Sequence, residues 1–415
     1  MAAAGPSATR GEGRRGDGRR GDGHVAALDG VRALAILLVL GVHAGAFFAP
    51  TPGGHAVMRV LGFGWAGVDL FFVLSGMLIT GILLDTRDAP GYYRSFFARR
   101  ALRIFPLYYA ALAVFLIAYP LFIAHRHHRP PEFLAEPVWL WTYTTNIGNA
   151  ITEHPAGKIE GFTFAFWSLA VEEQFYLVWP FVVARLSRRA LAWTAGTMMV
   201  VALLLRTWLV VLGGHSHGVY ESTPARMDAL AAGALIAILA REPGGLARLR
   251  RVAAPALGAA LLALAGVVAV AGGGSAHEPA PVATVGLTLL ALASSALLVL
   301  VLTAAPASRL RRALEWRPLR HLGARSYGVY VWHVAVFALL ADRVPPLLAP
   351  VVPWPALRGL LGLAFGAGAT LAVAEVSWTL LEAPMLRLKR FIPRPRAADA
   401  GGPVAAAPAA LGAAA

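Results

Sequence analysis

The chain has 415 residues, of which 58% are hydrophobic and only 14% charged, and its formal net charge is +15. Soluble domains have about a quarter of their residues charged, so this composition indicates a polytopic membrane protein. The positive charge does not indicate nucleic-acid binding, because the arginines form short clusters between apolar segments, as in the cytoplasmic loops of membrane proteins. The absence of cysteine excludes disulfides, thiolate metal sites and a cysteine nucleophile.

The chain divides into a membrane domain and two polar tails. Residues 1–27 are rich in Gly and Arg and predict a disordered, basic cytoplasmic tail, and the Pro/Ala/Gly-rich residues 391–415 predict a second disordered tail. Residues 28–390 contain ten apolar segments, of which the sixth and ninth are short for a bilayer span. The ten segments are 28–48, 65–84, 102–123, 164–184, 191–212, 226–240, 253–271, 282–303, 326–341 and 355–382.

The connecting segments differ strongly in charge. Of the 37 Lys and Arg residues, 28 lie in the two tails and in alternate connections, whereas the opposite connections hold five. Because cytoplasmic loops carry the excess of Lys and Arg, this asymmetry predicts that both termini are cytoplasmic. The sequence therefore predicts an all-α, multi-pass bundle of about ten transmembrane helices in the inner (plasma) membrane.

Arg32 and His43 are ionisable side chains inside the first apolar segment. Eleven residues separate them, so on an α-helix they lie within about 20° of one another and roughly 16 Å apart along the axis. Ionisable groups in a spanning helix normally face a protein interior or a wet cavity. The alternative is structural: Arg32 extends to the headgroups and His43 is satisfied inside the bundle.

The second segment, GVDLFFVLSGMLIT, places Asp69 at an outer depth similar to that of His43. Asp69 is therefore predicted to accept a hydrogen bond from one ring nitrogen of His43 and to leave the other nitrogen as a base. A purely structural Asp–His pair that holds two helices together is the alternative. Ser75 and Gly76 in the same segment are also typical of close helix packing.

Three arginines, Arg99, Arg100 and Arg103, lie in FFARRALRIFPLYY at the predicted inner surface. Their spacing places Arg99 or Arg100 on the same helix face as Arg103. A cluster of guanidinium groups suits phosphate or pyrophosphate, although such clusters are also common in cytoplasmic loops.

The longest outer segment is 124–163, with HRHH at 125–128 and several aromatic residues. Adjacent histidines could bind a metal, but no carboxylate at a suitable spacing completes a site, so no metal is predicted. We expect this segment to be a loop that contacts an acceptor substrate.

The later segments carry further buried polar residues. Glu172 and Glu173 point about 100° apart on one helix, and Arg206 reaches a similar depth as a structural partner. His333 and Tyr327 lie in SYGVYVWH, which places His333 in the inner half of the ninth segment. These residues are interpreted as a substrate-binding or structural polar core, together with Arg226, Asp228, Glu375 and Glu382.

An ordered series of motifs resembles the acyltransferase 3 family of bacterial integral-membrane acyltransferases. The series is LDGVRALAILLVLGVH, GVDLFFVLSGMLIT, FFARRALRIFPLYY, FWSLAVEEQFYL, RMDALAAGALIA, SYGVYVWH and LLEAP. Such a protein is expected to move an acyl group, preferably acetyl, from cytoplasmic acyl-CoA to a hydroxyl of a surface glycan or of a secreted small molecule such as a macrolide. Acyl-CoA is then a co-substrate, no bound cofactor is expected, and the other partners are the hydroxylated acceptor and the lipid bilayer.

The resemblance also implies roles for individual residues. His43 is expected to be the general base, with Arg32 steadying the thioester or the developing oxyanion and Asp69 orienting the base. Arg99, Arg100, Arg103 and Ser75 are expected to bind acyl-CoA. A covalent relay through Ser75 or His43 is the second mechanism, and a membrane transporter without enzymatic activity is the competing function.

Overall fold

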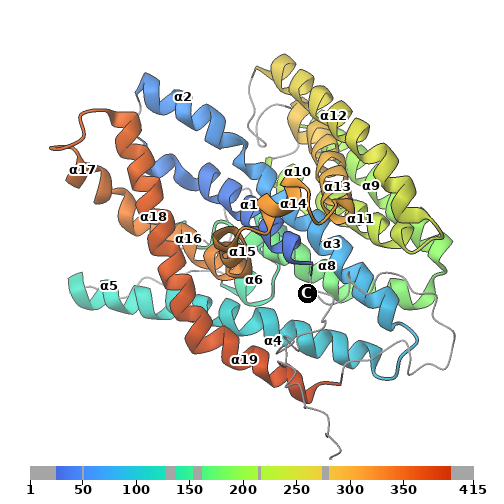
Figure 1. Ribbon diagram of the computed structural model, residues 1–415. Helices are drawn as coiled ribbons and strands as arrows, with labels where there is room; N and C mark the ends of the chain where they lie inside the picture. The colour runs from blue at the N-terminus through green and yellow to red at the C-terminus, as the bar shows by residue number, and fades with distance from the viewer. Residues whose placement is uncertain are drawn as a thin grey trace, which may run out of the picture.

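The computed structural model describes residues 25–48, 51–127, 137–152, 161–213, 216–272 and 280–393. All regular structure in these ranges is helical, which confirms the prediction of an all-α fold. The helices pack side by side in one bundle, with α1, α3 and α8 near its centre (Figure 1). Most of the two predicted tails lies outside the described residues, but the first helix already begins at Ala26.

Ten helices are long. They are α1 (Ala26–Val42), α3 (Ala66–Thr86), α4 (Tyr92–Ala113), α8 (Phe166–Arg185), α9 (Arg188–Val211), α11 (Thr223–Ala240), α12 (Gly245–Ala271), α13 (Leu287–Thr303), α16 (Ser326–Ala341) and α18 (Pro355–Ser377). The shorter α-helices are α2 (Pro52–Leu61), α5 (Tyr119–His127), α6 (Val138–Trp141), α7 (Thr145–Thr152), α10 (Ser216–Glu221), α14 (Arg309–Leu314), α15 (Arg317–Ala324), α17 (Val344–Leu348) and α19 (Ala383–Arg387). Single 3₁₀ segments are η1 (His43–Phe47), η2 (Gly62–Trp65) and η6 (Leu388–Phe391), and π-helical turns are η3 (Val114–Ala118), η4 (Val282–Gly286) and η5 (Trp378–Glu382).

All ten predicted apolar segments are helical. Within the described ranges, eight helices are long and apolar enough to cross a membrane, and the α15–α16 pair, bent by 74°, makes a ninth if it is counted as one span. The remaining predicted span is α8, which is 20 residues long but carries Glu172, Glu173 and Arg185. The structure therefore supports a multi-pass membrane bundle.

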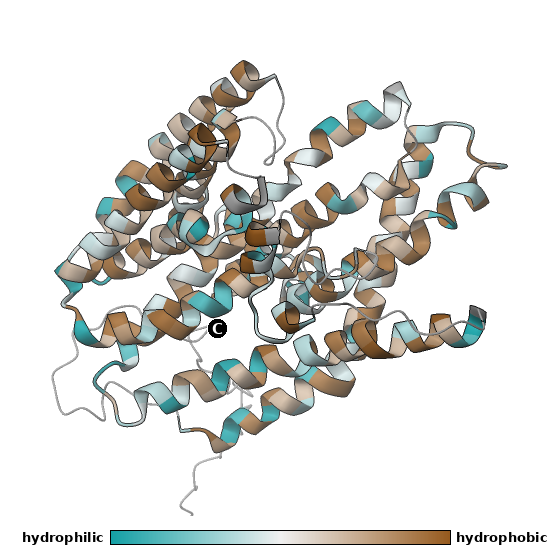
Figure 2. Ribbon diagram, turned by 180° about the vertical axis from the view of Figure 1, so that it is seen from behind, coloured by the Kyte–Doolittle hydropathy of each residue, from teal (hydrophilic) through white to brown (hydrophobic). Residues whose placement is uncertain are grey.

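The outward faces of the peripheral helices are apolar. Large hydrophobic side chains are exposed along α9, α12 and α18, among them Trp193, Val211, Leu262, Val270 and Phe365. Figure 2 shows the same hydrophobic colouring along the long helices. An exposed apolar surface of this extent suits contact with lipid chains.

The central helices approach one another at glycine residues. A Cβ atom added at Gly76 of α3 would lie 1.9 Å from the carbonyl oxygen of Leu230 in α11, and one added at Gly233 of α11 would lie 2.0 Å from that of Val73. Both positions admit only glycine at this separation, as is typical of close helix pairs in membranes. The contact fixes the face that α3 turns toward the centre of the bundle.

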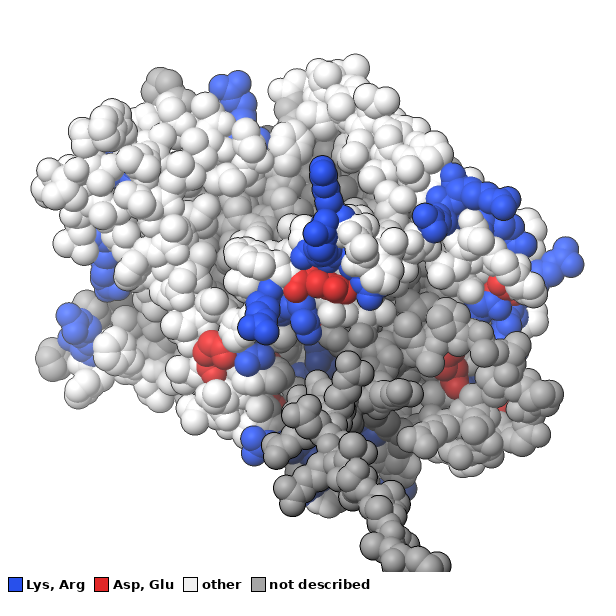
Figure 3. Space-filling view, in the orientation of Figure 1, with Lys and Arg blue, Asp and Glu red and all other residues white. Residues whose placement is uncertain are grey.

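The N-terminal end of α1 is held by α14 and α15. A Cβ atom at Gly30 would lie 2.2 Å from the carbonyl oxygen of Leu314, and one at Gly323 would lie 1.8 Å from that of Asp29. Lys and Arg side chains gather over α14 and α15 at the centre of this face (Figure 3). The charge pattern assigns this face to the cytoplasm, an orientation that remains a prediction.

Candidate active site

A pocket of about 120 Å³ lies where α1, α3, α4, α8 and α16 meet. Seven of the residues singled out in the sequence line it, although they are far apart along the chain: Arg32, Ser75, Arg100, Arg103, Glu172, Glu173 and Tyr327. His43, Asp69, Arg99, Arg206, Asp228 and His333 are not part of the lining. The structure thus divides the predicted site residues into a pocket set and a second set around it.

Three guanidinium groups give the pocket a concentrated positive charge. Arg32 comes from α1 and forms an ion pair with Asp29 at 2.8 Å, whereas Arg100 and Arg103 come from successive turns of α4. Arg100 lies over the ring of Tyr176, 5.1 Å from its centroid, and both α4 arginines interact electrostatically with Arg32. Like charges gathered in a cavity repel one another, so this arrangement favours a bound anion.

Arg99 faces another direction. Its Nη2 atom donates hydrogen bonds to the carbonyl oxygens of Lys389, at 3.2 Å, and Ile392, at 2.5 Å. Arg99 therefore ties α4 to the C-terminal turn and does not line the pocket with Arg100 and Arg103, so the pocket gives no support to its predicted contact with acyl-CoA. Arg99 points about 100° away from its neighbour Arg100 and lies one helical turn before Arg103, where it meets the C-terminal turn.

The acidic wall of the pocket is built around Glu172. Its carboxylate accepts hydrogen bonds from Ser75 at 2.9 Å and from Tyr176 at 3.0 Å, and the two hydroxyl groups lie 2.9 Å apart. The neighbouring Glu173 has a buried Oε1 atom with no hydrogen-bond partner among the described residues. Glu172 therefore already has hydrogen-bond partners, whereas Oε1 of Glu173 is an acceptor that a bound molecule could use.

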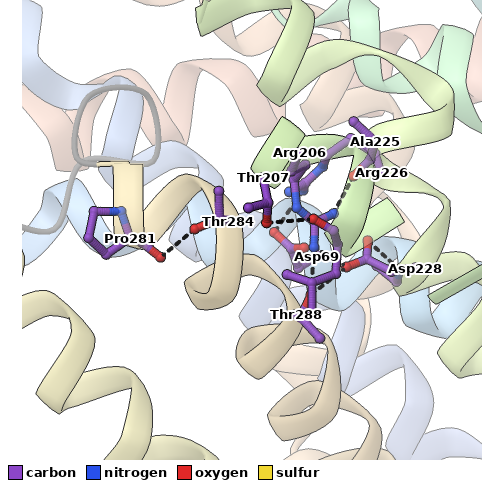
Figure 4. Close-up of polar contacts among 11 residues, drawn as sticks. Asp69, Arg206, Thr207, Ala225, Arg226, Asp228, Pro281, Thr284 and Thr288 are labelled. Atoms are coloured by element: carbon purple, nitrogen blue, oxygen red, sulfur yellow. Dashed lines mark hydrogen bonds and ion pairs between the residues drawn. The ribbon is translucent and has the colours of Figure 1, made fainter. Parts of the chain in front are cut away.

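The predicted pairing of the two glutamates with Arg206 is wrong. Arg206 donates to Asp228 at 2.7 Å and to Thr288 at 2.5 Å, and it also bonds to the carbonyl oxygen of Ala225. Figure 4 shows these groups converging with Arg226 and Asp69. Arg206 and Asp228 therefore belong to a buried ionic cluster that does not line the pocket.

Asp69 also belongs to this cluster. Its carboxylate accepts from Arg226 at 2.9 Å, and both side chains are fully buried. Arg226 lies over the rings of Tyr220, Phe72 and Trp167, at 4.8, 5.6 and 5.9 Å from their centroids. The arrangement satisfies much of the cation by ion pairing and by aromatic faces.

The predicted Asp69–His43 hydrogen bond is therefore wrong. A Cβ atom on Gly67 of α3 would lie 2.3 Å from the carbonyl oxygen of Ala35, eight residues before His43 in α1. The two helices run in opposite directions, so Asp69 lies more than about 12 Å below His43 along the axis. Only the tight glycine contact reveals this register.

His43 instead contacts His333. The Nδ1 atom of His43 lies 2.9 Å from the carbonyl oxygen of Val39 and 3.2 Å from Nε2 of His333. The two ring centroids are 4.8 Å apart. His333 therefore lies at the level of His43, and its predicted position in the inner half of the membrane is wrong.

Tyr330 connects the pocket with the histidine pair. It lines the pocket, and its ring centroid is 5.5 Å from that of His333. Its hydroxyl group donates to the carbonyl oxygen of Ala165 and hydrogen-bonds to Ser168. One side chain, Tyr330, thus both lines the pocket and contacts His333.

The segment 124–163 is only partly described, because 128–136 and 153–160, which include His128, lie outside the described residues. Its middle part forms the short helices α6 and α7, which bury one face, including Leu140, Asn146 and Asn149, and leave Val138 and Ile151 exposed. Asn146 donates to Thr223 and accepts from Gln174, both at 2.9 Å. No group of three or more metal-ligating side chains occurs in the described ranges.

The remaining polar residues have mainly structural partners. Tyr327 lines the pocket and donates to the carbonyl oxygen of Ile104 at 2.8 Å. Glu375 pairs with Arg325 at 3.0 Å, and Glu382 accepts from Ser377 at 3.1 Å.

Comparison with known proteins identifies the family. The sequence profile of the acyltransferase domain, acyltransferase 3, matches residues 25–374. The chain belongs to the acyltransferase 3 family. This result confirms the resemblance seen in the motifs, and the matched range covers every residue of the pocket and the histidine pair.

Two curated relatives of this acyltransferase 3 member are similar over most of the chain. The peptidoglycan O-acetyltransferase OatA of Listeria monocytogenes is 30% identical over 399 residues, which cover 89% of this chain and 57% of that protein. The O-acetyltransferase OatA of Staphylococcus aureus is 26% identical over 393 residues, covering 89% and 58%. The chain therefore spans little more than half the length of these relatives. No solved structure matches it.

The sequence analysis of this acyltransferase missed Tyr176, Tyr330 and Ser168. A periodicity signal was present for each tyrosine: Tyr176 follows Glu172 by four residues, and Tyr330 follows Tyr327 by three, so each shares a helix face with a residue already singled out. Ser168 had no comparable signal, because its role depends on a hydroxyl group from another helix.

Proposed function

We propose that this protein is an integral-membrane O-acyltransferase that moves an acetyl group from cytoplasmic acetyl-CoA to a hydroxyl group of a cell-surface glycan. One observation carries the proposal: three arginines and a hydroxyl–carboxylate cluster line a single pocket inside a bundle of the acyltransferase 3 family. The glycan acceptor is chosen because the relatives named above are O-acetyltransferases, one of them of peptidoglycan.

The pocket suits the donor. Phosphate groups of CoA would pair with Arg100 and Arg103, since guanidinium groups form strong charge-assisted bonds with phosphate. The pantetheine arm carries amide N–H groups, and the unpaired Oε1 atom of Glu173 supplies a matching acceptor. Arg32 lines the same pocket and would steady negative charge near the thioester.

His43 is the proposed general base. As the acceptor oxygen forms its bond to the acyl carbon, its proton moves to His43 and the carbon–sulfur bond breaks. That proton then passes to the leaving thiolate, which gives free CoA. His43 does not line the pocket, whereas Tyr330 both lines it and contacts His333, so the acyl end of the donor would approach His43 on the Tyr330 side.

The test follows release of CoA thiol by the full chain in membranes or detergent, supplied with acetyl-CoA and a soluble peptidoglycan fragment. The protein has no cysteine and therefore adds no thiol of its own to the signal from CoA. We expect His43→Gln to lower kcat by about 10²–10⁴, with the KM for acetyl-CoA nearly unchanged. A well-inserted His43→Gln protein with wild-type kcat would end the general-base proposal. Acetyl-CoA binding without thiol release for any hydroxylated acceptor would favour the transporter.

A further inference from the structure

The contacts of the histidine pair determine which nitrogen atoms carry hydrogen. Nδ1 of His43 lies 2.9 Å from the carbonyl oxygen of Val39, and Nδ1 of His333 lies 2.7 Å from that of Tyr330. A carbonyl oxygen can only accept, so each Nδ1 atom must be the N–H group of its ring. A neutral imidazole has one N–H group, which leaves both Nε2 atoms as bare acceptors.

This assignment gives the contact between the rings a direction. Nε2 of His333 lies 3.2 Å from Nδ1 of His43 and therefore accepts a hydrogen bond from it. The reverse direction would place the bare Nδ1 atoms of both rings against carbonyl oxygens, which is repulsive. Nε2 of His43 consequently holds the lone pair, and no protein group among the described residues bonds to it.

The surroundings of His333 support the same arrangement. Its side chain is fully buried, and the aromatic rings of Tyr330 and Phe337 lie 5.5 and 6.1 Å from it. In the described part of the chain no carboxylate pairs with either histidine, and Asp69 is engaged by Arg226. In a Ser-His-Asp triad a carboxylate holds the Nδ1–H group of the base, and here a neutral imidazole takes that position.

We propose that His333 is the positioning residue for His43 and that a pair of neutral histidines replaces the usual carboxylate–histidine pair. The Val39 carbonyl oxygen and Nε2 of His333 together hold the Nδ1–H group of His43, and so fix the tautomer that has a basic Nε2 atom. His333 also keeps the hydrogen bond from Nδ1 when His43 takes the acceptor proton and becomes an imidazolium. This inference rests on the proposed role of His43 as base.

Two amide substitutions separate this role from a structural one. In His333→Gln the amide group reaches the place of Nε2 and can still accept from His43. In His333→Asn the shorter amide group reaches only the place of Nδ1, so it can keep the bond to Tyr330 but not the one to His43. Both variants are polar and of similar volume, which makes each the control for the other.

We expect His333→Asn to lower kcat about 10- to 100-fold, the effect of one hydrogen bond to a charged group, and to leave the KM for acetyl-CoA unchanged. His333→Gln should recover most of the lost kcat. Phe337→Leu, which alters packing beside His333 but no hydrogen bond, should keep wild-type kcat. His333→Phe, an apolar ring among aromatic neighbours, should show the same loss as Asn and replaces it if the Asn variant does not insert.

The outcomes distinguish the two proposals. The positioning role is overturned if a well-inserted His333→Asn or His333→Phe protein has wild-type kcat, or if His333→Gln loses as much kcat as His333→Asn. In either case a low kcat in His43→Gln would still support His43 as the base. Wild-type kcat in His43→Gln overturns the base and, with it, this inference. A structural role predicts that every His333 variant loses folded protein and that the surviving protein turns over normally.

Discussion

Arg99 and Arg103 lie on the same helix, four residues apart, and have different environments. Arg99 donates to two carbonyl oxygens of the C-terminal turn, whereas Arg103 lines the pocket. If the pocket holds acyl-CoA phosphates, only Arg103 should contribute to donor affinity. Substituting each arginine in turn therefore removes the same side chain from two locations, one inside the pocket and one outside it.

Arg103→Gln should raise the KM for acetyl-CoA about 10- to 100-fold, because each charge-assisted contact is worth about 1.5–3 kcal/mol. The KM for the acceptor should change little. Arg99→Gln should leave both constants near wild type and instead loosen the C-terminal turn, which limited proteolysis would detect. If well-inserted Arg103→Gln had the wild-type KM for acetyl-CoA, Arg103 would not bind the donor and would be an ordinary positively charged residue near a cytoplasmic loop.

Sequence patterns predicted which side chains are unusual better than how those side chains pair. Arg32, Ser75, Arg100 and Glu172 stand out as polar groups in apolar segments, and the structure gathers them in one pocket. The partner of Asp69 could not be predicted, because it depends on the relative height of two helices. That height is set by where Gly67 meets α1, a contact that leaves no periodic signal.

At the scale of helices, the α3–α11 contact positions one wall of the pocket. Ser75 precedes Gly76, whose Cα faces the backbone of α11 without room for a side chain. This contact therefore fixes the rotation of α3 and with it the direction of Ser75 toward Glu172. Among the helices themselves, apolar length predicted most of the bundle. The short helices α6 and α7, which bury one face in the bundle, were missed because their Asn and Thr residues are typical of exposed loops.

Gly76→Ala should lower the melting temperature of the detergent-solubilised protein, since the new methyl group would overlap the carbonyl group of Leu230 and overpacking costs about 1–3 kcal/mol. The thermal loss of monodisperse protein measures this effect. Gly258→Ala is the control, because nothing lies within 4 Å of a Cβ atom there. Equal melting temperatures for the two variants would contradict the tight α3–α11 contact.

For the molecule as a whole, function depends on which face meets the cytoplasm. The arginine-rich surface over α14 and α15 lies at the N-terminal end of α1, the end that carries Arg32. Acyl-CoA is cytoplasmic, so the proposed reaction requires this face to be cytoplasmic. The prediction of a cytoplasmic donor therefore fails if the prediction of the orientation fails.

Single cysteines introduced into this cysteine-free chain test the orientation. Asp88 and Trp316 are exposed on the face assigned to the cytoplasm, and Val351 is exposed in the connection after α17. A membrane-impermeant maleimide should label Val351→Cys in intact cells. Asp88→Cys and Trp316→Cys should be labelled only after permeabilisation. The reversed pattern would place the arginine-lined pocket on the outside and exclude cytoplasmic acyl-CoA as the donor.

The Asp69–Arg226 ion pair also has a consequence for biosynthesis. Its partners are 157 residues apart, so α3 leaves the ribosome long before α11 does. At a synthesis rate of about 5–20 residues per second, Arg226 is synthesised roughly 8–30 s after Asp69. During that time a carboxylate without its native partner sits in an otherwise apolar segment, which is costly inside a bilayer. Stable insertion of α3 is therefore a late event, completed when α11 arrives, and a chain truncated before Arg226 should be recognised and degraded as unassembled.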